Sequence, residues 1–315
     1  MSIGGGYADR VFDGFETFDV ALDSVTVHGV RGGAGPPLLL LHGFPQSHVM
    51  WAPVATRLAR THTVIAPDLR GYGDSSVPPD AADHSHACFR AMARDQVELL
   101  ASFGHERATV VGHDRGARVT HRLALDFPDR VDRVALLDIL PTRYVFEHLD
   151  QRVATAYYHW FFFPQPAPLP ETLIGADPSF YLRTLLGRWG GGGPLRSHPQ
   201  AIPAYERSFA EPSRRHAMIE DYRAAASIDL VHDRESDARG DRVGVPTLVL
   251  WGQLGLVGAS PVSPLDVWRT QVADGVPVTG GVIEGAGHFL VEDAPDATLA
   301  ALEPFLSPSA GIRGG

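Results

Sequence analysis

Residues 109–118 read Thr-Val-Val-Gly-His-Asp-Arg-Gly-Ala-Arg, and this stretch decides the fold class. An apolar run, Ala108–Val111, leads into the pattern Gly-x-Asp-x-Gly, and an amphipathic segment, Ala117–Phe127, follows it. A strand, a tight turn between two glycines and a helix form a nucleophile elbow, in which the central side chain projects from a strained turn. The usual occupant is serine, but here it is Asp114. The stretch therefore predicts an α/β fold that carries a nucleophilic carboxylate.

Short apolar runs separated by amphipathic stretches continue this pattern over most of the chain. Such alternation is typical of βαβ units that build a parallel sheet. Two runs rich in β-branched and aromatic residues, Phe15–Leu22 and Ser24–Val30, predict an opening hairpin. We expect further strands at Leu38–Leu41, Thr63–Ala66, Ala108–Val111, Val134–Leu137 and Thr247–Trp251, and helices at Val49–Arg60, Arg90–Phe103, Ala117–Phe127 and Ala294–Phe305.

The alternation stops between about residues 141 and 237. Closely spaced prolines, a dense group of aromatic residues and a run of glycines at 190–193 interrupt this segment. Short helices are a better prediction for it than strands, and the glycine run predicts a flexible loop. We therefore expect a core domain of residues 1–140 and 238–315, with a mostly parallel central sheet and helices on both faces. Residues 141–237 are expected to form an inserted helical cap domain.

Composition and charge narrow the class of protein. Of the 315 residues 44% are hydrophobic and 20% are charged, which excludes a disordered or fibrous chain. The formal net charge is −10, which argues against nucleic acid and anionic membrane surfaces as partners. The one cysteine, Cys88, argues against an internal disulfide and a cysteine-based metal site. Because the first ten residues lack an apolar core and no apolar run approaches membrane-spanning length, we expect a cytoplasmic protein.

A carboxylate on an elbow suits displacement at a saturated carbon, because it needs no base to become nucleophilic. The resulting ester must be hydrolysed, and this requires a His–carboxylate pair that activates water. A final short strand is expected to end at Val282-Ile283, and His288 lies in the glycine-rich loop that follows it. Its acidic partner is found by elimination, because residues 252–258 contain no carboxylate, whereas Asp138 directly follows a strand. A lone Asp in such an apolar setting needs a partner, and a helix cap is the alternative role.

Two arginines follow the candidate nucleophile closely. Arg115 and Arg118 fall on the first turn of one helix and could hold a substrate carboxylate between their planar guanidinium groups. The alternative is that they neutralise nearby carboxylates: Asp114, Asp126 or Asp129.

The stretch His42-Gly43-Phe44-Pro45 directly follows the first parallel strand. Backbone N–H groups in such a loop, here that of Phe44, combine with the amide of the residue after the nucleophile, here Arg115, to form an oxyanion hole. A simple turn is the alternative reading of this stretch.

These residues together resemble the α/β-hydrolase superfamily and, within it, the fluoroacetate dehalogenases (haloacetate dehalogenases). The resemblance runs from about Phe15 to Phe305. Its most informative pieces are HGFPQSHVMW (42–51), DLRGYGDS (68–75), GHDRGARV (112–119), YHW (158–160), EDYRA (220–224) and GHFLVEDAP (287–295). HGFP and the elbow are shared with epoxide hydrolases, whereas HDRGAR, YHW and EDYRA are much narrower.

The resemblance implies hydrolysis of haloacetates, with fluoroacetate converted to glycolate and fluoride. Asp114 would be the nucleophile, His288 the base and Asp138 its partner. The resemblance further implies a small haloacid substrate, no cofactor, no metal and a homodimer. The binding residues that it implies are Arg115 and Arg118 for the carboxylate, His159, Trp160 and Tyr222 for the halide, and Trp189 at the pocket entrance. Three uncharged donors suit fluoride, because a site without water must replace the strong hydration of this ion.

Three other functions compete with this interpretation. An epoxide hydrolase would use the same triad, with tyrosines such as Tyr158 and Tyr222 protonating the epoxide oxygen, but it would leave the two arginines without a use. A haloalkane dehalogenase usually has tryptophan where this chain has Arg115. A ligand-binding protein on this fold tends to keep a serine triad or to lose the base, whereas Asp, His and Asp are all present here.

Overall fold

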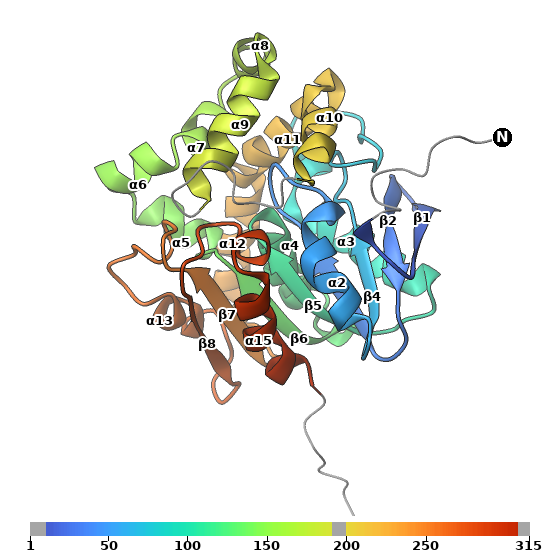
Figure 1. Cartoon of the computed structure of the whole chain (residues 1–315). Helices are drawn as coiled ribbons and strands as arrows, with labels where there is room; N and C mark the ends of the chain where they lie inside the picture. Colours follow the sequence, from blue (N-terminus) through green and yellow to red (C-terminus); the bar gives the residue numbers. More distant parts are fainter. Residues whose placement is uncertain (1–10, 191–199, 308–315) are drawn as a thin grey trace, which may run out of the picture.

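The computed structural model describes residues 11–190 and 200–307. At its centre lies an eight-stranded sheet in the order β1-β2-β4-β3-β5-β6-β7-β8 (Figure 1). β2 pairs antiparallel with both β1 and β4, and the other strand pairs are parallel, which confirms the mostly parallel α/β sheet. The strands are β1 (Phe15–Ala21), β2 (Thr26–Gly32), β3 (Pro37–Leu41), β4 (Thr63–Pro67), β5 (Ala108–His113), β6 (Val131–Leu137), β7 (Thr247–Gly252) and β8 (Val278–Ile283).

The central and edge strands differ in burial, as their sequences predict. The four consecutive leucines of β3, Leu38–Leu41, are all completely buried. A strand that is covered on both faces can be apolar at every position, and this is the usual condition in a parallel sheet. The edge strand β1 instead contains only exposed and half-buried residues. The continuous apolar run of β3 therefore marks a strand at the centre of the sheet.

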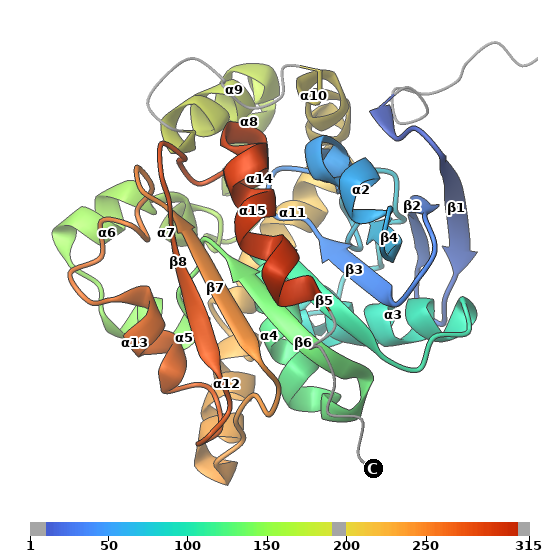
Figure 2. The same ribbon diagram turned by 60° about the horizontal axis from the view of Figure 1, so that its bottom comes forward.

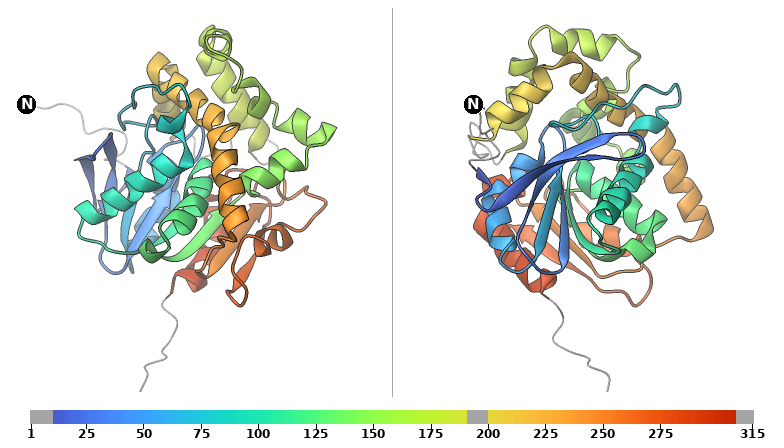
Figure 3. Two further views of the ribbon diagram at one scale, coloured as in Figure 1. Left: turned by 180° about the vertical axis from the view of Figure 1, so that it is seen from behind. Right: turned by 90° about the vertical axis from the view of Figure 1, so that its right-hand side faces the viewer.

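Helices cover both faces of the sheet. In Figure 2, α2 and α15 lie in front of the strands, whereas α3, α4 and α12 lie in front when the molecule is seen from behind (Figure 3, left). α13 is on the same face as α4, because Trp268 packs its ring 5.1 Å from that of His121. These helices are α2 (Ala52–Leu58), α3 (Phe89–Ser102), α4 (Arg115–Asp126), α13 (Pro264–Arg269), α14 (Leu290–Asp293) and α15 (Pro295–Leu306).

Helix ends differ from the expected ones where local chemistry intervenes. The expected helix Val49–Arg60 begins as a 3-10 turn, His48–Trp51, and becomes α-helical from Ala52, with a proline in its first turn. The elbow helix α4 begins at Arg115, directly after the turn residue. Further 3-10 turns are Ser85–Ala87 and Pro128–Arg130. In the described part of the chain, no helix has the length and apolar character needed to cross a membrane.

The chain between β6 and β7 forms short helices, as the prolines and glycines indicate. Four of these helices, α8 to α11, have proline in their first turn, where a missing N–H costs nothing. The helices are α5 (Thr142–Glu147), α6 (Gln151–Ala156), α7 (His159–Phe162), α8 (Leu169–Gly175), α9 (Pro178–Trp189), α10 (Ile202–Ala210), α11 (Pro212–Ala225) and α12 (Ile228–Arg239). Residues 191–193 of the expected glycine loop lie outside the described residues.

The helices of this insertion do not all lie together. Figure 1 shows α6 to α11 gathered above the sheet, whereas α12 runs beside the sheet near α4. Arg122 on α4 donates hydrogen bonds to Ser236 (2.8 Å) and Asp233 (2.5 Å) on α12. The predicted cap of residues 141–237 therefore includes a helix that packs with those covering the sheet, and the domain division stays a prediction.

Parallel strands bring distant parts of the sequence to one edge of the sheet. β3, β5, β6, β7 and β8 all end at this edge, and each is followed by a loop. In open α/β sheets, ligands bind outside the carboxyl ends of the strands. The loops here carry Phe44, Asp114, Asp138, residues 253–260 and His288.

Candidate active site

Asp114 occupies the turn between β5 and α4. Its backbone φ of +46° is unfavourable for a residue with a side chain, and such strain is often retained where it positions a functional group. Gly112 and Gly116 make the turn possible, because a Cβ on either would overlap backbone oxygens. The Asp114 Oδ2 atom accepts a hydrogen bond of 3.0 Å from the backbone N–H of Phe44. A Cβ on Gly43 would lie 2.5 Å from the Asp114 Cβ, so this position also requires glycine.

The charge of Asp114 is set by its surroundings. Burial opposes ionisation, but His288 and the guanidinium groups of Arg118 and Arg115 outweigh it and hold the pKa of Asp114 below its ordinary value. The side chain is therefore an anion at neutral pH. An ionised carboxylate is the form required of a nucleophile.

His288 lies between two carboxylates. Its Nδ1 is 2.6 Å from Asp138 Oδ2, and its Nε2 is 4.0 Å from Asp114 Oδ1. Burial lowers the pKa of His288, but the hydrogen bond to Asp138 and the two negative charges raise it above the ordinary value overall. Asp138 accepts a second hydrogen bond, of 2.9 Å, from the backbone N–H of Gly252. The arrangement fixes the imidazole orientation and leaves Nε2 facing Asp114.

Two backbone contacts hold the loop that bears His288. The ring of His113 lies beside that of His288, and its Nε2 is 2.8 Å from the His288 carbonyl oxygen. Burial lowers the pKa of His113 to about 3, so this ring is neutral and can donate that bond. The His288 N–H donates to the Trp189 carbonyl oxygen at 2.8 Å. His288 is thus positioned from both the sheet and the insertion.

Arg115 is completely buried and paired with Asp221 on α11. Its Nε donates to Asp221 Oδ2 at 2.8 Å, and its Nη2 donates to both Asp221 Oδ1 and the Asp221 carbonyl oxygen. The hydroxyl of Tyr72 also donates to Asp221 Oδ2, at 2.7 Å. The Arg115 Nη1 atom is buried and has no partner in the described part of the chain. One edge of the guanidinium is therefore occupied, and the other retains a free donor.

Arg118 is held differently. Its Nη1 donates to the Leu140 carbonyl oxygen (3.1 Å) and to Thr142 Oγ1 (2.9 Å), and no carboxylate is bonded to it among the described residues. The guanidinium lies 4.6 Å from the Trp160 ring, and burial lowers the pKa of Arg118. Its Nε is buried without a partner in the same part of the structure.

The alternative pairing with Asp126 does not occur, because Asp126 is bonded to Arg90 and Arg122. Burial of an unpaired cation is costly, so Arg118 is a position where an anionic ligand would be stabilised.

A cavity of about 250 Å³ lies over Asp114. Its wall includes the three expected halide ligands: His159 and Trp160 from α7 and Tyr222 from α11. The Tyr222 ring is 5.4 Å from His159 and 6.5 Å from Trp160. Burial lowers the pKa of His159 to about 3, so the trio is uncharged. The other lining residues are Asp138, Ala156, Tyr157, Arg188, Trp189, Leu254, Gly255, Leu256, Ala259 and His288.

Two further aromatic residues complete the comparison with the sequence. Trp189 is partly exposed and lines the cavity between His159 and His288, with ring distances of 4.5 and 5.9 Å, and its place at the entrance stays a prediction. Tyr158, the proton donor of the epoxide alternative, is absent from the wall, and its hydroxyl donates to the Tyr181 hydroxyl at 3.0 Å. Its neighbour Tyr157 faces the cavity instead and stacks on Trp160 at 5.2 Å.

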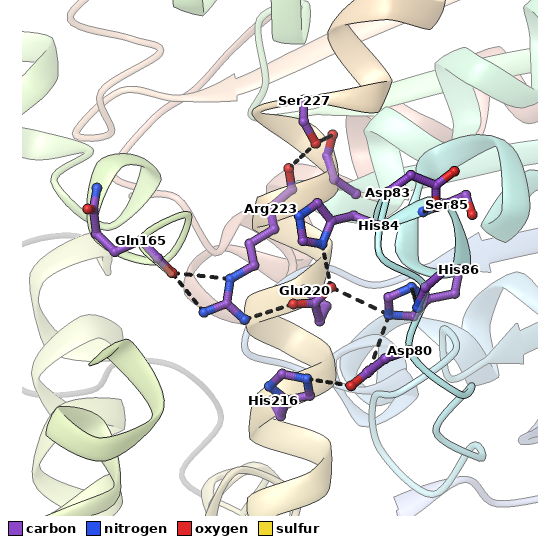
Figure 4. A network of polar contacts seen from close by, with 12 residues as sticks. Asp80, Asp83, His84, Ser85, His86, Gln165, His216, Glu220, Arg223 and Ser227 are labelled. Atoms are coloured by element: carbon purple, nitrogen blue, oxygen red, sulfur yellow. Dashed lines mark hydrogen bonds and ion pairs between the residues drawn. The ribbon is translucent and has the colours of Figure 1, made fainter. Parts of the chain in front are cut away.

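α11, which carries Asp221 and Tyr222, is anchored by a polar network (Figure 4). Arg223 donates to Glu220 (2.7 Å) and to the Gln165 carbonyl oxygen (2.8 Å). Glu220 also bonds His84 Nδ1 at 2.7 Å. The network therefore connects α11 to the loop before α3 and to the chain after α7.

Two groups of potential metal ligands lie away from the cavity wall. In each, the ligand atoms are within 4.8 Å of one another: His28, His48 and Asp68 in one, and Cys88, Asp229 and His232 in the other. Hydrogen bonds already account for part of both groups, because Asp68 accepts from the His48 and Asp74 amides and Asp229 accepts from the Phe89 amide.

Sequence reasoning missed residues whose roles depend on distant partners. Asp221 stands in the EDYRA stretch but received no role, although a buried Arg115 requires a carboxylate partner. Tyr72 in DLRGYGDS completes that contact. Arg188, an exposed residue on the cavity wall, carried no sequence signal.

The fold and the site define a hydrolase class. Residues 36–295 match the family described as alpha/beta hydrolase fold, and the chain belongs to this family. A fluoroacetate dehalogenase from Burkholderia sp. is 46% identical over 297 residues, which cover 94% of this chain and 95% of that protein. The resemblance inferred from sequence is thereby confirmed, and the chain is an enzyme of the hydrolase class.

Epoxide hydrolases are also among the relatives. A soluble epoxide hydrolase from Corynebacterium sp. (strain C12) is 32% identical, covering 91% of this chain and 96% of that protein. Among solved structures, ALR0039 from Nostoc sp. PCC 7120, an alpha/beta hydrolase by its description, has a TM-score of 0.89 and 49% identity, covering 93% of this chain and 98% of that one. Because relatives of both kinds match over most of the chain, family membership alone does not decide the substrate.

Proposed function

We propose that this enzyme hydrolyses haloacetates, with fluoroacetate converted to glycolate and fluoride. The observation that carries the proposal is the pair of buried guanidinium groups beside an ionised Asp114, each with one donor unpartnered among the described residues. Asp221 occupies only one edge of Arg115, and no described carboxylate is bonded to Arg118, so the two groups offer donors that would neutralise the carboxylate of a haloacid, whereas a neutral substrate would leave these donors unpartnered. The similarity to a fluoroacetate dehalogenase supports the same substrate class.

The first step forms an ester on the enzyme. Asp114 Oδ1 attacks the halide-bearing carbon, the new C–O bond forms as the C–F bond breaks, and fluoride leaves with the bonding electrons. His159, Trp160 and Tyr222 line the cavity and offer N–H and O–H donors to the departing ion. Because burial keeps His159 neutral, the departing halide would be surrounded by three uncharged donor groups, none of which is a carboxylate.

The second step hydrolyses the glycolyl ester. His288 Nε2 removes a proton from water, and the hydroxide adds to the Asp114 carboxyl carbon. The negative charge then develops on Oδ2, the atom that already accepts a hydrogen bond from the Phe44 amide. We propose the Arg115 amide as the second donor. Collapse returns the proton from His288 to the glycolate oxygen and leaves Asp114 with one oxygen from water.

The second candidate is an epoxide hydrolase, favoured by the relatives of that name and by Tyr222 and Tyr157 facing the cavity. Direct competition decides between the two. Purified enzyme should release fluoride from fluoroacetate, measured with a fluoride electrode, and should show lower kcat/KM for a small epoxide such as propylene oxide. Preference for the epoxide, or for chloroacetamide over chloroacetate, would overturn the haloacid assignment.

The proposal also includes a homodimer, which the resemblance implies, and a cytoplasmic location. Analytical ultracentrifugation of the purified enzyme would detect the dimer. A monomer with full activity would remove that part of the proposal and leave the chemistry intact.

A further inference from the structure

The central cavity is larger than a haloacetate requires. Its volume is about 250 Å³. A two-carbon haloacid occupies on the order of 100 Å³, taking about 30 Å³ for each water-sized group. Part of the wall carries none of the residues proposed to act on haloacetate. It comes from the end of α6, the residue after it and the loop after β7, and it includes Ala156, Tyr157, Leu254, Gly255, Leu256 and Ala259.

A second cavity of about 150 Å³ adjoins this part of the wall. Tyr157 and Leu256 line both cavities, so these two side chains form the partition between them. The second cavity is lined mainly by apolar side chains, among them Leu140, Val145, Val153, Val257, Pro261 and Val262. An apolar cavity that continues from a reaction site is suited to an apolar part of the same ligand.

The walls of the second cavity are fixed by contacts of their own. Arg152 on α6 donates a hydrogen bond of 2.7 Å to the Ala259 carbonyl oxygen, which ties this helix to the loop after β7. On the other side, the rings of Tyr144 and His148 stack at 4.0 Å. Val257 is almost completely buried. The cavity is therefore bounded by elements that contact one another directly.

We propose that the second cavity takes an alkyl or aryl substituent on the halide-bearing carbon, so that the substrate class extends to 2-haloacids with apolar chains. The inference rests on the proposed function. The arginines would hold the carboxylate, and His159, Trp160 and Tyr222 would hold the halogen. The direction opposite the halogen is needed for attack by Asp114. A substituent can therefore replace only one of the two hydrogens of haloacetate. It would extend toward Tyr157 and Leu256, the side on which the second cavity adjoins the first.

This geometry has a stereochemical consequence. When carboxylate, halogen and line of attack are fixed, only one of the two remaining positions on the carbon faces the partition. One enantiomer of a 2-haloacid would place its chain in the second cavity, whereas the other would direct it away from the partition, against the opposite wall of the central cavity. The enzyme should therefore consume one enantiomer, with inversion at the carbon.

The test uses a series of 2-bromo acids of increasing chain length, because bromide leaves readily and differences then report the fit of the chain. Wild type should show kcat/KM rising by up to about fourfold per methylene until the cavity is full, as expected for burial of a CH₂ group. Val153→Phe and Val257→Phe place bulk in the second cavity. Either should lower kcat/KM for 2-bromohexanoate at least tenfold relative to bromoacetate. Leu256→Ala removes part of the partition and should raise kcat/KM for 2-bromohexanoate relative to that for bromoacetate.

The control is Val231→Phe, the same change at an exposed position of α12 outside both cavities. The inference is overturned if wild type dehalogenates bromoacetate but none of the longer acids, or consumes both enantiomers equally. It is also overturned if the phenylalanine variants lower kcat/KM equally for bromoacetate and 2-bromohexanoate. That result would identify the second cavity as a passage for water or halide. Failure of the proposed function looks different, because wild type would then release no halide from any haloacid.

Discussion

His288 is the residue whose replacement separates the two chemical steps. His288→Gln removes the proposed base and, with it, the largest of the charges that lower the pKa of Asp114; Arg118 and Arg115 remain beside Asp114 and still favour its anion. Attack should proceed, and hydrolysis should slow by a factor of about 10²–10⁴. Mass spectrometry of the intact variant after mixing with fluoroacetate should show one added glycolyl group on Asp114. Normal turnover without an accumulated ester would show that another group acts as the base.

Trp160 and Tyr222 should matter most for the halide that is hardest to stabilise. Trp160→Phe and Tyr222→Phe keep most of the ring packing and remove one donor each. A donor to a developing anion contributes roughly 2.7–4 kcal/mol in comparable sites. Fluoroacetate turnover should fall on the order of a hundredfold, with a clearly smaller loss for bromoacetate. The ratio of the two rates on one preparation cancels folding defects, and equal losses would reduce both residues to packing roles.

At the level of elements, the contact between α4 and α11 depends on one buried ion pair. Asp221→Asn leaves the charge of Arg115 without its partner in a completely buried position and should destabilise the protein by about 3–5 kcal/mol. Urea unfolding measures this difference. Asp74→Asn is a matched control, because its pair with Arg207 is exposed and should contribute at most about 1 kcal/mol. Equal losses for the two variants would show that the buried pair does not hold α11.

The sequence predicts elements well where burial is continuous and poorly where a helix is short. The leucine run of β3 and the elbow at Asp114 place the strands and loops, and parallel pairing then brings Asp138 and His288 to the same edge. The aromatic run 157–163 could not be resolved in this way. A helix of four residues, His159–Phe162, has too few turns for its sequence to indicate which face is buried, so Tyr157 and Tyr158 were not distinguished.

Long-range partners were inaccessible for a different reason. The sequence separates Arg115 from Asp221 by 106 positions, and no local pattern relates α4 to α11. Chemistry shows that a buried arginine needs a carboxylate, but only the packing of the insertion on the sheet identifies which one.

For the molecule as a whole, pH dependence of stability should contain a contribution from Glu292. Burial raises its pKa to about 8, although it accepts hydrogen bonds from Tyr205 and Gln46. Between the ordinary value near 4.5 and this value, the folded protein keeps a proton that the unfolded chain loses. The contribution of Glu292 to the free energy of unfolding is therefore fully present below about pH 4.5. Between pH 4.5 and 8 it decreases by up to about 1.4 kcal/mol per pH unit.

Glu292→Gln keeps the shape of the protonated side chain but has no carboxyl group that can ionise. The variant should gain stability over wild type as pH rises from 5 to 8, measured as the free energy of urea unfolding at each pH. Glu284→Gln, at an exposed position, should leave the wild-type curve unchanged. Parallel curves for wild type and Glu292→Gln would show that Glu292 is ionised in the folded protein.

Arg188 has a consequence for how fast substrate arrives. The chain has a net charge of −10, so an approaching anion is repelled at long range, yet this exposed arginine places a positive charge on the cavity wall. Arg188→Gln should lower kcat/KM for fluoroacetate several-fold at low ionic strength, and the difference should vanish near 1 M salt, where charges are screened within about 3 Å. Arg183→Gln, on the same helix but outside the cavity wall, is the control. A loss independent of salt would mean that Arg188 contacts the bound substrate; a loss that salt removes would make encounter by diffusion the step that this residue accelerates.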